Sequence, residues 1–478
     1  MRWWCSTLVS AALAACLPLY LLSGCEQRLE PPAQHGELLV AVRQTPAYFQ
    51  EENGKAKGFD HDLVQFFALE LGVKARFLVA ADHQELLTWV KQGKVHFAAA
   101  PQADDPGLRF TSTLRESGQL IVQHASAPLA DSLEALAGKR IEVLAGSPQE
   151  AALKAMGNGH PPFVIVPRDD LNEIDLLERV SLKKSELAAT DTTHFKIASN
   201  FYPEVEEAQE LGSKVNFAWA FAADGDPALY QRAQEFVRRI RQDGTLVRVH
   251  DRYFGHIHRI TNDGVSDFLE HVSRVLPHYR AAFIAAQEVT GIDWRLLAAL
   301  AYQESRWDPL ATSPTGVRGI MMLTEDTADH LKVTNRLDAK QSIRAGAKYL
   351  AELIEQVPAT VHEPDRTWLA LAAYNLGNGH MNGARAIATG LKRDASSWFE
   401  MKQVLPLLAR QKYYDRLKSG RARGGEAVIM VENVRTYHDI LSRFEPAYLG
   451  SNYAPPIFSI PPMYERSDTG TVMLPLPF

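Results

Sequence analysis

The stretch Asp293-Trp-Arg-Leu-Leu-Ala-Ala-Leu-Ala-Tyr-Gln-Glu304 decides the fold of the C-terminal half of this chain. Asp293 is a residue type that caps helix starts, and the pattern after it predicts a helix over residues 294–303. The apolar side chains of this helix share one face: Leu296, Leu297 and Leu300. Glu304 follows on the same face, where the spacing predicts a leucine. A carboxylate at such a position is either paired or functional.

Two interpretations of Glu304 follow from the pattern alone. Burial disfavours the charged form of a carboxylate and raises its pKa, as a general acid working near neutral pH requires. The alternative is a structural glutamate that forms an ion pair with Arg306 or Arg318. Helical spacing of apolar residues continues from residue 265 to about residue 445, so the whole C-terminal half is predicted to be helical.

Three further stretches follow in order along this helical half. They are Glu304-Ser-Arg-Trp-Asp-Pro-Leu-Ala-Thr-Ser313 continuing to Gly316-Val-Arg-Gly-Ile-Met-Met-Leu323, then Leu371-Ala-Ala-Tyr-Asn-Leu-Gly377, then Val431-Glu-Asn-Val-Arg-Thr-Tyr437. Together they resemble the signatures of the soluble-lytic-transglycosylase and goose-type lysozyme fold over residues 265–450. The resemblance implies a mainly α, lysozyme-like domain that cleaves the glycan strands of peptidoglycan.

The same resemblance implies a mechanism centred on Glu304. This residue protonates the glycosidic oxygen that leaves C1 of N-acetylmuramic acid, and the 2-acetamido oxygen of the sugar attacks C1. The ionised Glu304 then takes the proton of the C6 hydroxyl, whose oxygen closes on C1 to give a 1,6-anhydro end. Such substrate-assisted routes are exceptions to the two-carboxylate rule, so no second protein carboxylate is required.

Substrate-binding residues are also implied by the resemblance. Ser313 matches a position near the acetamido and lactyl groups of the substrate. Tyr374 matches a residue that lines the sugar site, and Asn375 beside it matches a polar contact. Tyr437 matches a tyrosine whose hydroxyl bonds the catalytic carboxylate and fixes its rotamer.

One position departs from the family pattern. The family often has Gly-Leu-Met-Gln-Leu, with the glutamine reaching substrate, and here Met322 stands in its place. The hydrogen bond of the glutamine is therefore lost, and Met322 is expected to form an apolar wall of the sugar site. Gly316 and Gly319 are expected to keep the backbone turn.

The N-terminal half has a different periodicity. Buried strands are predicted over residues 37–43, 73–80, 95–100 and 139–145, with helices over residues 59–71 and 85–92 between them. Strands that alternate with helices of this length indicate an α/β fold with a parallel sheet. The predicted fold class is therefore α/β plus mainly α.

Several stretches of this half resemble the family 3 periplasmic solute-binding proteins over residues 36–256. They include Gly54-Lys-Ala-Lys-Gly-Phe-Asp-His-Asp-Leu-Val64 and Gly138-Lys-Arg-Ile-Glu-Val-Leu-Ala-Gly-Ser147. The resemblance implies two lobes that close on a ligand, expected here to be an amino acid or a muropeptide. Arg109 is the candidate for the ligand carboxylate and Asp191 for its amino group; the alternative is a surface charge and a helix cap.

The first residues indicate export and lipid attachment. An apolar run over residues 8–22 follows Arg2 and resembles a secretory signal, and Leu-Ser-Gly-Cys25 at its end resembles a lipobox. Cleavage before Cys25 would leave it as the single cysteine, placed for acylation and anchoring in the outer membrane. A transmembrane anchor is the alternative. The combination of these parts resembles the membrane-bound lytic transglycosylases.

Composition sets the remaining expectations. A length of 478 residues predicts two domains, and a net charge of -6 gives no basic footprint for nucleic acid. The sixteen histidines show no metal-ligand spacing, and neither a metal nor another cofactor is expected. The predicted segments are a signal peptide over 1–24, a lipidated linker over 25–35, a solute-binding-like regulatory domain over 36–256, a linker over 257–264, a catalytic domain over 265–450 and a Pro-rich tail over 451–478.

Two other functions fit the same residues. A lysozyme-type muramidase would place water instead of the C6 hydroxyl at C1 and leave a reducing end. A lipoprotein solute receptor would use the helical domain only to bind glycan. The presence of Glu304, Tyr374 and Tyr437 together favours an active enzyme over the receptor.

Overall fold

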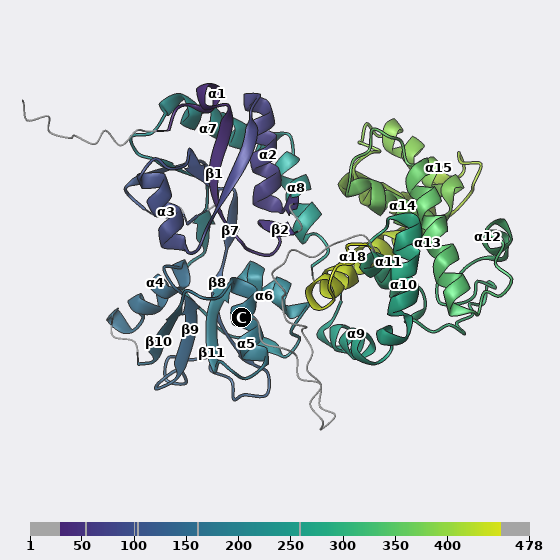
Figure 1. The fold of residues 1–478 in the computed structure, drawn as a ribbon, viewed down its shortest axis with the longest axis horizontal. Helices are drawn as coiled ribbons and strands as arrows, with labels where there is room; N and C mark the ends of the chain where they lie inside the picture. Colours follow the sequence, from purple (N-terminus) through teal and green to yellow (C-terminus); the bar gives the residue numbers. More distant parts are fainter. Residues whose placement is uncertain are drawn as a thin grey trace, which may run out of the picture. The chain divides into compact units, whose positions relative to one another are not determined.

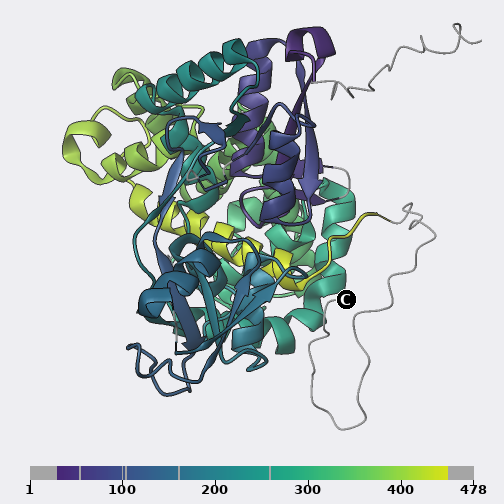
Figure 2. The same cartoon turned by 90° about the vertical axis from the view of Figure 1, so that its left-hand side faces the viewer.

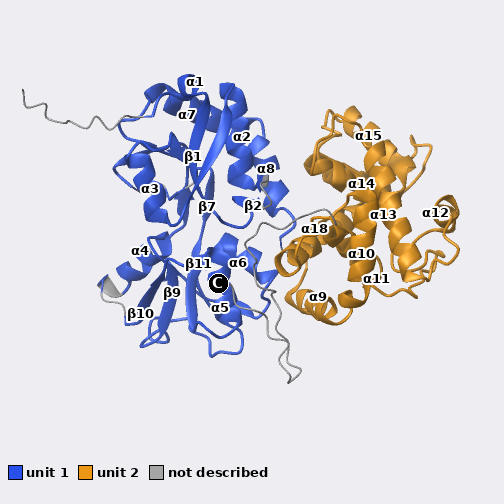
Figure 3. Cartoon of the chain, in the orientation of Figure 1, with its two compact units in different colours: residues 1–258 blue, residues 259–478 orange. Residues whose placement is uncertain are grey.

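A computed structural model describes residues 29–450, apart from 53–54, 100, 103–104, 160–161 and 258–259. Its contacts divide the chain into two compact units, residues 1–258 and residues 259–478 (Figure 3). The predicted signal peptide over residues 1–24, the predicted lipidation site Cys25 and the tail over 451–478 lie outside the described residues. In the part that the structure describes, no helix is long and apolar enough to cross a membrane.

The first lobe of unit 1 is a mixed sheet with helices around it. Its elements are α1 (Pro32–His35), β1 (Glu37–Arg43), β2 (Gln50–Glu52), β3 (Lys55–Lys57), α2 (Phe59–Leu71), β4 (Lys74–Ala80), α3 (His83–Lys91), β5 (Phe97–Ala98), β6 (Leu108–Phe110), β14 (Ala220–Ala222), α7 (Pro227–Gln242) and α8 (Thr245–Phe254). The strand order is β4-β1-β5-β14-β6. β1 pairs in parallel with β4 and β5, and β14 pairs antiparallel with β5 and β6.

The second lobe repeats this arrangement with its own sheet (Figures 1 and 2). Its elements are β8 (Gln119–His124), β9 (Arg140–Leu144), α4 (Pro148–Ala155), η1 (Met156–Gly159), β10 (Val164–Arg168), α5 (Glu173–Ser181), β11 (Leu187–Asp191), α6 (Thr192–Ser199) and β12 (Val205–Glu210). The strand order is β10-β9-β11-β8-β12. Between the lobes, β7 (Arg115–Ser117) and β13 (Val215–Phe217) form a two-stranded antiparallel ribbon.

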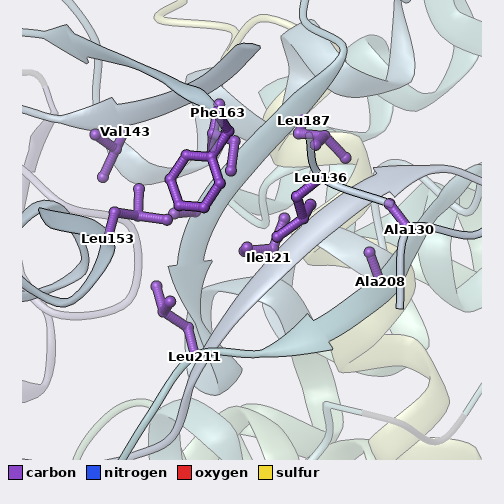
Figure 4. Close-up of a cluster of buried hydrophobic side chains, with 11 residues drawn as sticks. Ile121, Ala130, Leu136, Val143, Leu153, Phe163, Leu187, Ala208 and Leu211 are labelled. Carbon is purple, nitrogen blue, oxygen red and sulfur yellow. The ribbon is translucent and has the colours of Figure 1, made fainter. Parts of the chain in front are cut away.

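Apolar side chains on one face of the second sheet form the core of that lobe. Figure 4 shows this cluster, in which strand residues such as Ile121 and Val143 lie with Leu136, Leu153 and Phe163 from the surrounding segments. Each fully buried side chain of this size stabilises the fold by roughly 1.5–3 kcal/mol. The cluster therefore fixes how the second lobe packs onto its sheet.

Unit 2 consists mainly of helices in its described residues. They are α9 (Asn262–Arg274), α10 (Leu276–Thr290), α11 (Trp294–Ser305), α12 (Glu325–His330), α13 (Ala339–Gln356), α14 (Asp365–Leu376), α15 (Asn378–Gly390), α16 (Trp398–Val404), η2 (Leu405–Ala409), α17 (Gln411–Tyr414) and α18 (Gly424–Phe444). α11 packs against α10, α13 and α18, and α18 also packs against α14. These contacts place α11 in the interior of the unit.

The predicted fold class is confirmed, and most predicted elements lie where the pattern placed them. The first predicted strand and helix match β1 and α2 at both ends. The strand predicted over 95–100 is shorter, because only Phe97–Ala98 pairs as β5. The sheets are mixed instead of wholly parallel, because β14 in the first lobe and β8 in the second lobe run antiparallel to their neighbours.

Candidate active site

Helix α11 carries Glu304 in its last turn. Asp293 caps the helix start by accepting a hydrogen bond from the backbone N–H of Arg295, as its residue type predicted. The helix reaches Ser305, two residues beyond the predicted end, and every residue from 294 to 302 is buried. Because α11 is buried on every side over most of its length, it holds Glu304 on a rigid element.

The chain turns sharply directly after this glutamate. Arg306 and Trp307 both have positive φ angles, 54° and 62°, although neither is a glycine. Such residues cost about 1–3 kcal/mol each unless their surroundings hold them in place. The surroundings of Trp307 fix it in this conformation. Its indole Nε1 donates to the carbonyl of Ala298 at 2.8 Å, and its side chain is 1% exposed.

The loop over residues 311–323 is tied to the end of α11. The hydroxyl of Ser305 donates to the carbonyl of Ile320 at 2.9 Å. Gly319 has a φ of 84°, and a Cβ there would meet the carbonyl oxygen of Arg336 at 1.9 Å. Only glycine fits both constraints, so the predicted role of this position in the turn is confirmed. Gly316 also has a positive φ, 82°.

Glu304 is half-buried and without a partner. No ion pair and no hydrogen bond involves its side chain among residues 29–450 as described. The guanidinium of Arg306 lies instead 3.4 Å from the carboxylate of Asp267, so the predicted alternative of an ion pair with Arg306 or Arg318 is wrong. Burial raises the pKa of Glu304 to about 7, and no charged neighbour contributes to that shift. The carboxyl group is therefore poised to hold or release a proton near neutral pH.

Tyr374 on α14 lies near Glu304. Burial raises its pKa well above the usual value, and the charge of Glu304 raises it further. Its hydroxyl donates to the carbonyl of Met321 at 2.8 Å, which joins α14 to the 311–323 loop. Tyr374 therefore holds the wall of the site beside the carboxylate. Asn375, next to it in sequence, is exposed on the same helix.

Ser313 and Met322 belong to the loop over residues 311–323. The oxygen of the Ser313 hydroxyl accepts from the backbone N–H groups of Thr315 and Val317, both at 3.2 Å, which fixes its direction within the turn. Met322 is half-buried and has a φ of 47°, so the loop backbone is constrained on both sides of Gly319.

Tyr437 on α18 lies among aromatic rings. Its ring centroid is 4.5 Å from that of Phe268 and 4.9 Å from that of Tyr302. Tyr302 in turn donates to Asp267 at 2.6 Å. The expected hydrogen bond from Tyr437 to Glu304 is absent from the described residues, so the ring packing of Tyr437, and not a bond to the acid, is what the structure provides. No pattern in the sequence indicated a role for Asp267 or Tyr302.

Unit 1 holds a second candidate site, in an open cleft between its lobes. The free space of the cleft, which includes open solvent, is about 700 Å³. Polar residues from both lobes and the ribbon line it: Arg43, Thr45, Asp60, His83, Arg115, Ser147, Gln149, Glu173, Thr190, Asp191 and His194. No group of three or more His, Cys, Asp and Glu side chains in the described segments could hold a metal ion.

The two ligand-binding candidates of unit 1 have different positions. Arg109 does not line the cleft; its guanidinium donates to the carbonyls of Ala222 and Gly225, with the latter bond 2.9 Å long. Asp191 does line the cleft, but it caps α6 and forms an ion pair with His194. Burial would raise the pKa of Asp191, and the charge of His194 holds it well below its usual range. Arg109 is therefore not among the residues that line the cleft, and Asp191 is already engaged within the protein.

Comparisons with known proteins agree with this two-unit architecture. The family model described as "Bacterial extracellular solute-binding proteins, family 3" matches residues 38–256, and "Transglycosylase SLT domain" matches residues 281–396. The protein named membrane-bound lytic murein transglycosylase F from Methylobacillus flagellatus is 40% identical over 439 residues, 90% of this chain and 93% of that protein. The protein of the same name from Nitrosospira multiformis is 40% identical over 435 residues, 90% of this chain and 91% of that protein.

Among solved structures, an ancestral arginine-binding protein bound to arginine is similar to part of this chain. It is 24% identical with a TM-score of 0.41, and the match covers 46% of this chain and 98% of that chain.

Proposed function

The chain belongs to the family of the membrane-bound lytic murein transglycosylases F, and on this basis we propose that unit 2 cleaves the glycan strands of peptidoglycan with Glu304 as acid and base. The observation that carries the proposal is the state of this carboxyl group. It is held at the end of a buried helix, has no ion-pair or hydrogen-bond partner among the described residues, and has a pKa of about 7. It can therefore donate a proton first and accept one later.

The proposed reaction takes place in two proton transfers. Protonated Glu304 gives its proton to the glycosidic oxygen as the bond from C1 of N-acetylmuramic acid breaks, and the 2-acetamido oxygen of that sugar bonds to C1. The ionised Glu304 then removes the proton of the C6 hydroxyl. The C6 oxygen bonds to C1, the acetamido group is released, and a 1,6-anhydro end results. The two transfers together return Glu304 to its protonated state after one turnover.

The surroundings of Glu304 support the substrate-assisted route. A retaining glycosidase with a protein nucleophile needs two carboxyl groups about 5–5.5 Å apart. Burial is the only cause of the raised pKa of Glu304, so no second carboxylate acts on it from the described residues. This supports a nucleophile that is supplied by the substrate. Ser313, Met322, Tyr374, Asn375 and Tyr437 are the proposed substrate-binding residues around it.

Digestion of purified sacculi followed by mass spectrometry tests this reaction. The expected product carries a 1,6-anhydro end, which is lighter by one water than a reducing end. A reducing end would identify a muramidase instead. The rate, measured across pH, should fall above about pH 7, because the acid must hold its proton when substrate binds. A rate that is unchanged to pH 9 would contradict Glu304 as the acid.

We also propose that Cys25 is acylated and holds the chain at the outer membrane. The lipobox-like stretch Leu-Ser-Gly-Cys25 supports this, and several acyl chains would give stable anchoring. Metabolic labelling with a fatty-acid analogue tests it: the wild type should be labelled and sediment with outer membranes, and Cys25→Ala should be neither. Label that is retained by Cys25→Ala would contradict the assignment.

Unit 1 is proposed to bind an amino acid or a cell-wall peptide and to regulate cleavage. Two lobes joined by the β7–β13 ribbon, with a polar cleft between them, support a ligand-binding role. Coupling between two sites is typically worth 1–3 kcal/mol, so a saturating ligand should change the turnover rate or the substrate affinity by roughly 5–150-fold. An unchanged rate with every amino acid and muropeptide tested would favour a targeting role for unit 1.

A further inference from the structure

The charged side chain nearest to Glu304 in the sequence is that of Arg306. Cα atoms two residues apart lie at most about 7 Å from each other, a distance that a long arginine side chain can bridge. The Nη1 atom of Arg306 nevertheless lies 3.4 Å from the Oδ2 atom of Asp267, and no ion pair joins Arg306 to Glu304 among the described residues. Asp267 therefore holds the charge of Arg306 away from the buried carboxyl group.

Asp267 on α9 contacts residues on both sides of Glu304. Its carboxylate accepts a hydrogen bond from the hydroxyl of Tyr302 at 2.6 Å, two residues before the glutamate, and pairs with Arg306, two residues after it. The backbone between these positions is fixed, because the N–H of Arg306 donates to the carbonyl of Tyr302 at 2.8 Å. The side chain of Arg306 is 72% exposed, so it is the part of this turn that could move if Asp267 were lost.

Aromatic packing attaches α9 to the end of α11 independently of this carboxylate. The ring centroid of Phe268 lies 4.5 Å from those of Tyr302 and Tyr437 and 5.7 Å from that of Trp307. Phe268 itself is fully buried. A change confined to the carboxylate of Asp267 should therefore leave the two helices packed against each other.

The other titratable groups near Glu304 and near the Asp267–Arg306 pair come from several helices. They are His271 of α9, Tyr302 of α11, Tyr349 of α13, Tyr374 of α14 and Tyr437 of α18. Burial raises the pKa of all four tyrosines, so they stay neutral over the pH range in which the enzyme would be assayed. No charged side chain of α10, α13, α14 or α18 acts on the pKa of Glu304, because burial is the only cause of its shift.

We propose that Asp267 is a positioning residue for the acid Glu304, because it holds the guanidinium of Arg306 and so prevents an ion pair between Arg306 and Glu304. This assignment rests on the proposed role of Glu304. It adds a residue of α9, which ends before residue 281, where the match to the transglycosylase family model begins. A glutamate that is paired with Arg306 would stay ionised and could not donate its proton to the glycosidic oxygen.

The pH dependence of cleavage tests the assignment. The initial rate at which sacculi release soluble muropeptides, measured at low substrate concentration, reports the pKa of the acid in the free enzyme. Asp267→Asn keeps the size of the side chain and releases Arg306. An opposite charge within about 4–6 Å lowers the pKa of a carboxyl group by about 1–3 units, so the midpoint of the alkaline loss should fall by at least about 1 pH unit. The rate at pH 8 should then fall about tenfold, and the rate at about pH 5 should change little.

The double variant decides whether Arg306 is the cause of this shift. Arg306→Gln alone removes the guanidinium and should keep the alkaline midpoint of the wild type, near pH 7. Asp267→Asn combined with Arg306→Gln should recover that midpoint, because no cation is released. A midpoint that stays low in the double variant would overturn the assignment, since the shift would then come from Asp267 itself.

Matched controls address the other contacts of Asp267. Tyr302→Phe removes the second hydrogen bond to the carboxylate and keeps the ring, and His271→Gln removes an imidazole, a group that ordinarily titrates near neutral pH. Both should keep the midpoint of the wild type. An equal shift in either one, or a loss of rate in Asp267→Asn that is the same at every pH, would overturn the assignment.

Two further measurements separate the failure of this assignment from the failure of the proposed function. If Glu304→Gln keeps a tenth or more of the activity, the acid lies elsewhere and both fail. If Glu304→Gln is inactive but Asp267→Asn keeps the midpoint of the wild type, Glu304 remains the acid and only the role of Asp267 is overturned. Thermal unfolding reports whether each variant keeps its fold, and Asp267→Ser, which also lacks the carboxylate, gives the same answer if Asp267→Asn does not fold.

Discussion

Two glutamates of the helical unit have opposite environments. Glu304 at the end of α11 has no ion-pair partner among the described residues, and burial raises its pKa to about 7. Glu432 on α18 is fully buried, yet Arg435 contacts it at 2.8 Å, and the indole of Trp398 donates to it at 2.6 Å. Burial alone would raise the pKa of Glu432, but the charges of Arg435 and Lys402 hold it below the usual value. Burial makes a carboxylate reactive only where nothing neutralises it.

The largest effect is expected on the stability of the protein, when the paired glutamate Glu432 is replaced. Glu432→Gln removes the carboxylate that the buried Arg435 contacts at 2.8 Å, and removing one partner of such a pair typically destabilises a protein by about 3–5 kcal/mol. Denaturant unfolding of wild type and variant measures the difference in the free energy of unfolding. A loss below about 1 kcal/mol would show that the network around Glu432 contributes little, and that its low pKa is not a sign of stabilisation.

Glu304→Gln tests whether the other glutamate is the acid of glycan cleavage. The change keeps the shape of the side chain and removes the transferable proton, so glycan cleavage should fall by at least ~10²-fold while the fold is kept. Release of soluble muropeptides from sacculi measures the rate, and circular dichroism checks the fold. Activity at a tenth of wild type or above would place the acid elsewhere, with Asp308 the next residue to replace.

The pH dependence of stability sharpens the comparison further. Because the folded pKa of Glu304 is raised, its protonated form is favoured in the fold, and stability is lost as pH rises from the unfolded value of about 4.5 through about 7. Glu304→Gln should therefore be as stable as wild type below pH 4.5 and more stable above pH 7, by at most about 3 kcal/mol. Equal stability at pH 8 would contradict the raised pKa. For Glu432, whose pKa is lowered, stability is instead lost as pH falls.

Tyr437→Phe should have the smallest effect. The structure places this ring against Phe268 and Tyr302 and gives its hydroxyl no hydrogen bond to Glu304. Phenylalanine keeps the packing, so the rate should fall by less than about tenfold, and the loss of activity above pH 7 should keep its midpoint. A shifted midpoint would show that the hydroxyl reaches Glu304 when substrate is bound.

The local pattern of the chain predicted the elements that carry the active site. The sequence pattern predicted three of these features: the cap at Asp293, the apolar helix after it and the glutamate at its end. It could do so because helix spacing and capping depend on residues a few positions apart. The pattern predicted a single apolar stripe, whereas α11 is buried on all sides. That difference arises because α10, α13 and α18 surround it, which no stretch of twelve residues can indicate.

Partners distant in the sequence could not be predicted in this way. Arg109 and Arg115 are both arginines near the end of the first lobe, and the pattern favoured Arg109 for the ligand. The fold instead satisfies Arg109 with carbonyls 113 and 116 positions away and places Arg115 in the cleft, between two rings. Which guanidinium lines the cleft depends on strand pairing across the molecule.

The sequence by itself determined the two kinds of fold, the glutamate at the end of an apolar helix and the glycine turn beside it, because each is set by periodicity, capping or backbone freedom within a short stretch. Only the tertiary structure decided that Glu304 has no ion-pair or hydrogen-bond partner among the described residues and that Glu432 has one. It alone also decided that Arg306 pairs with Asp267 and not with Glu304. The reason is physical: the proton affinity of a carboxylate depends on burial and on neighbouring charges, and folding brings those neighbours from distant parts of the chain.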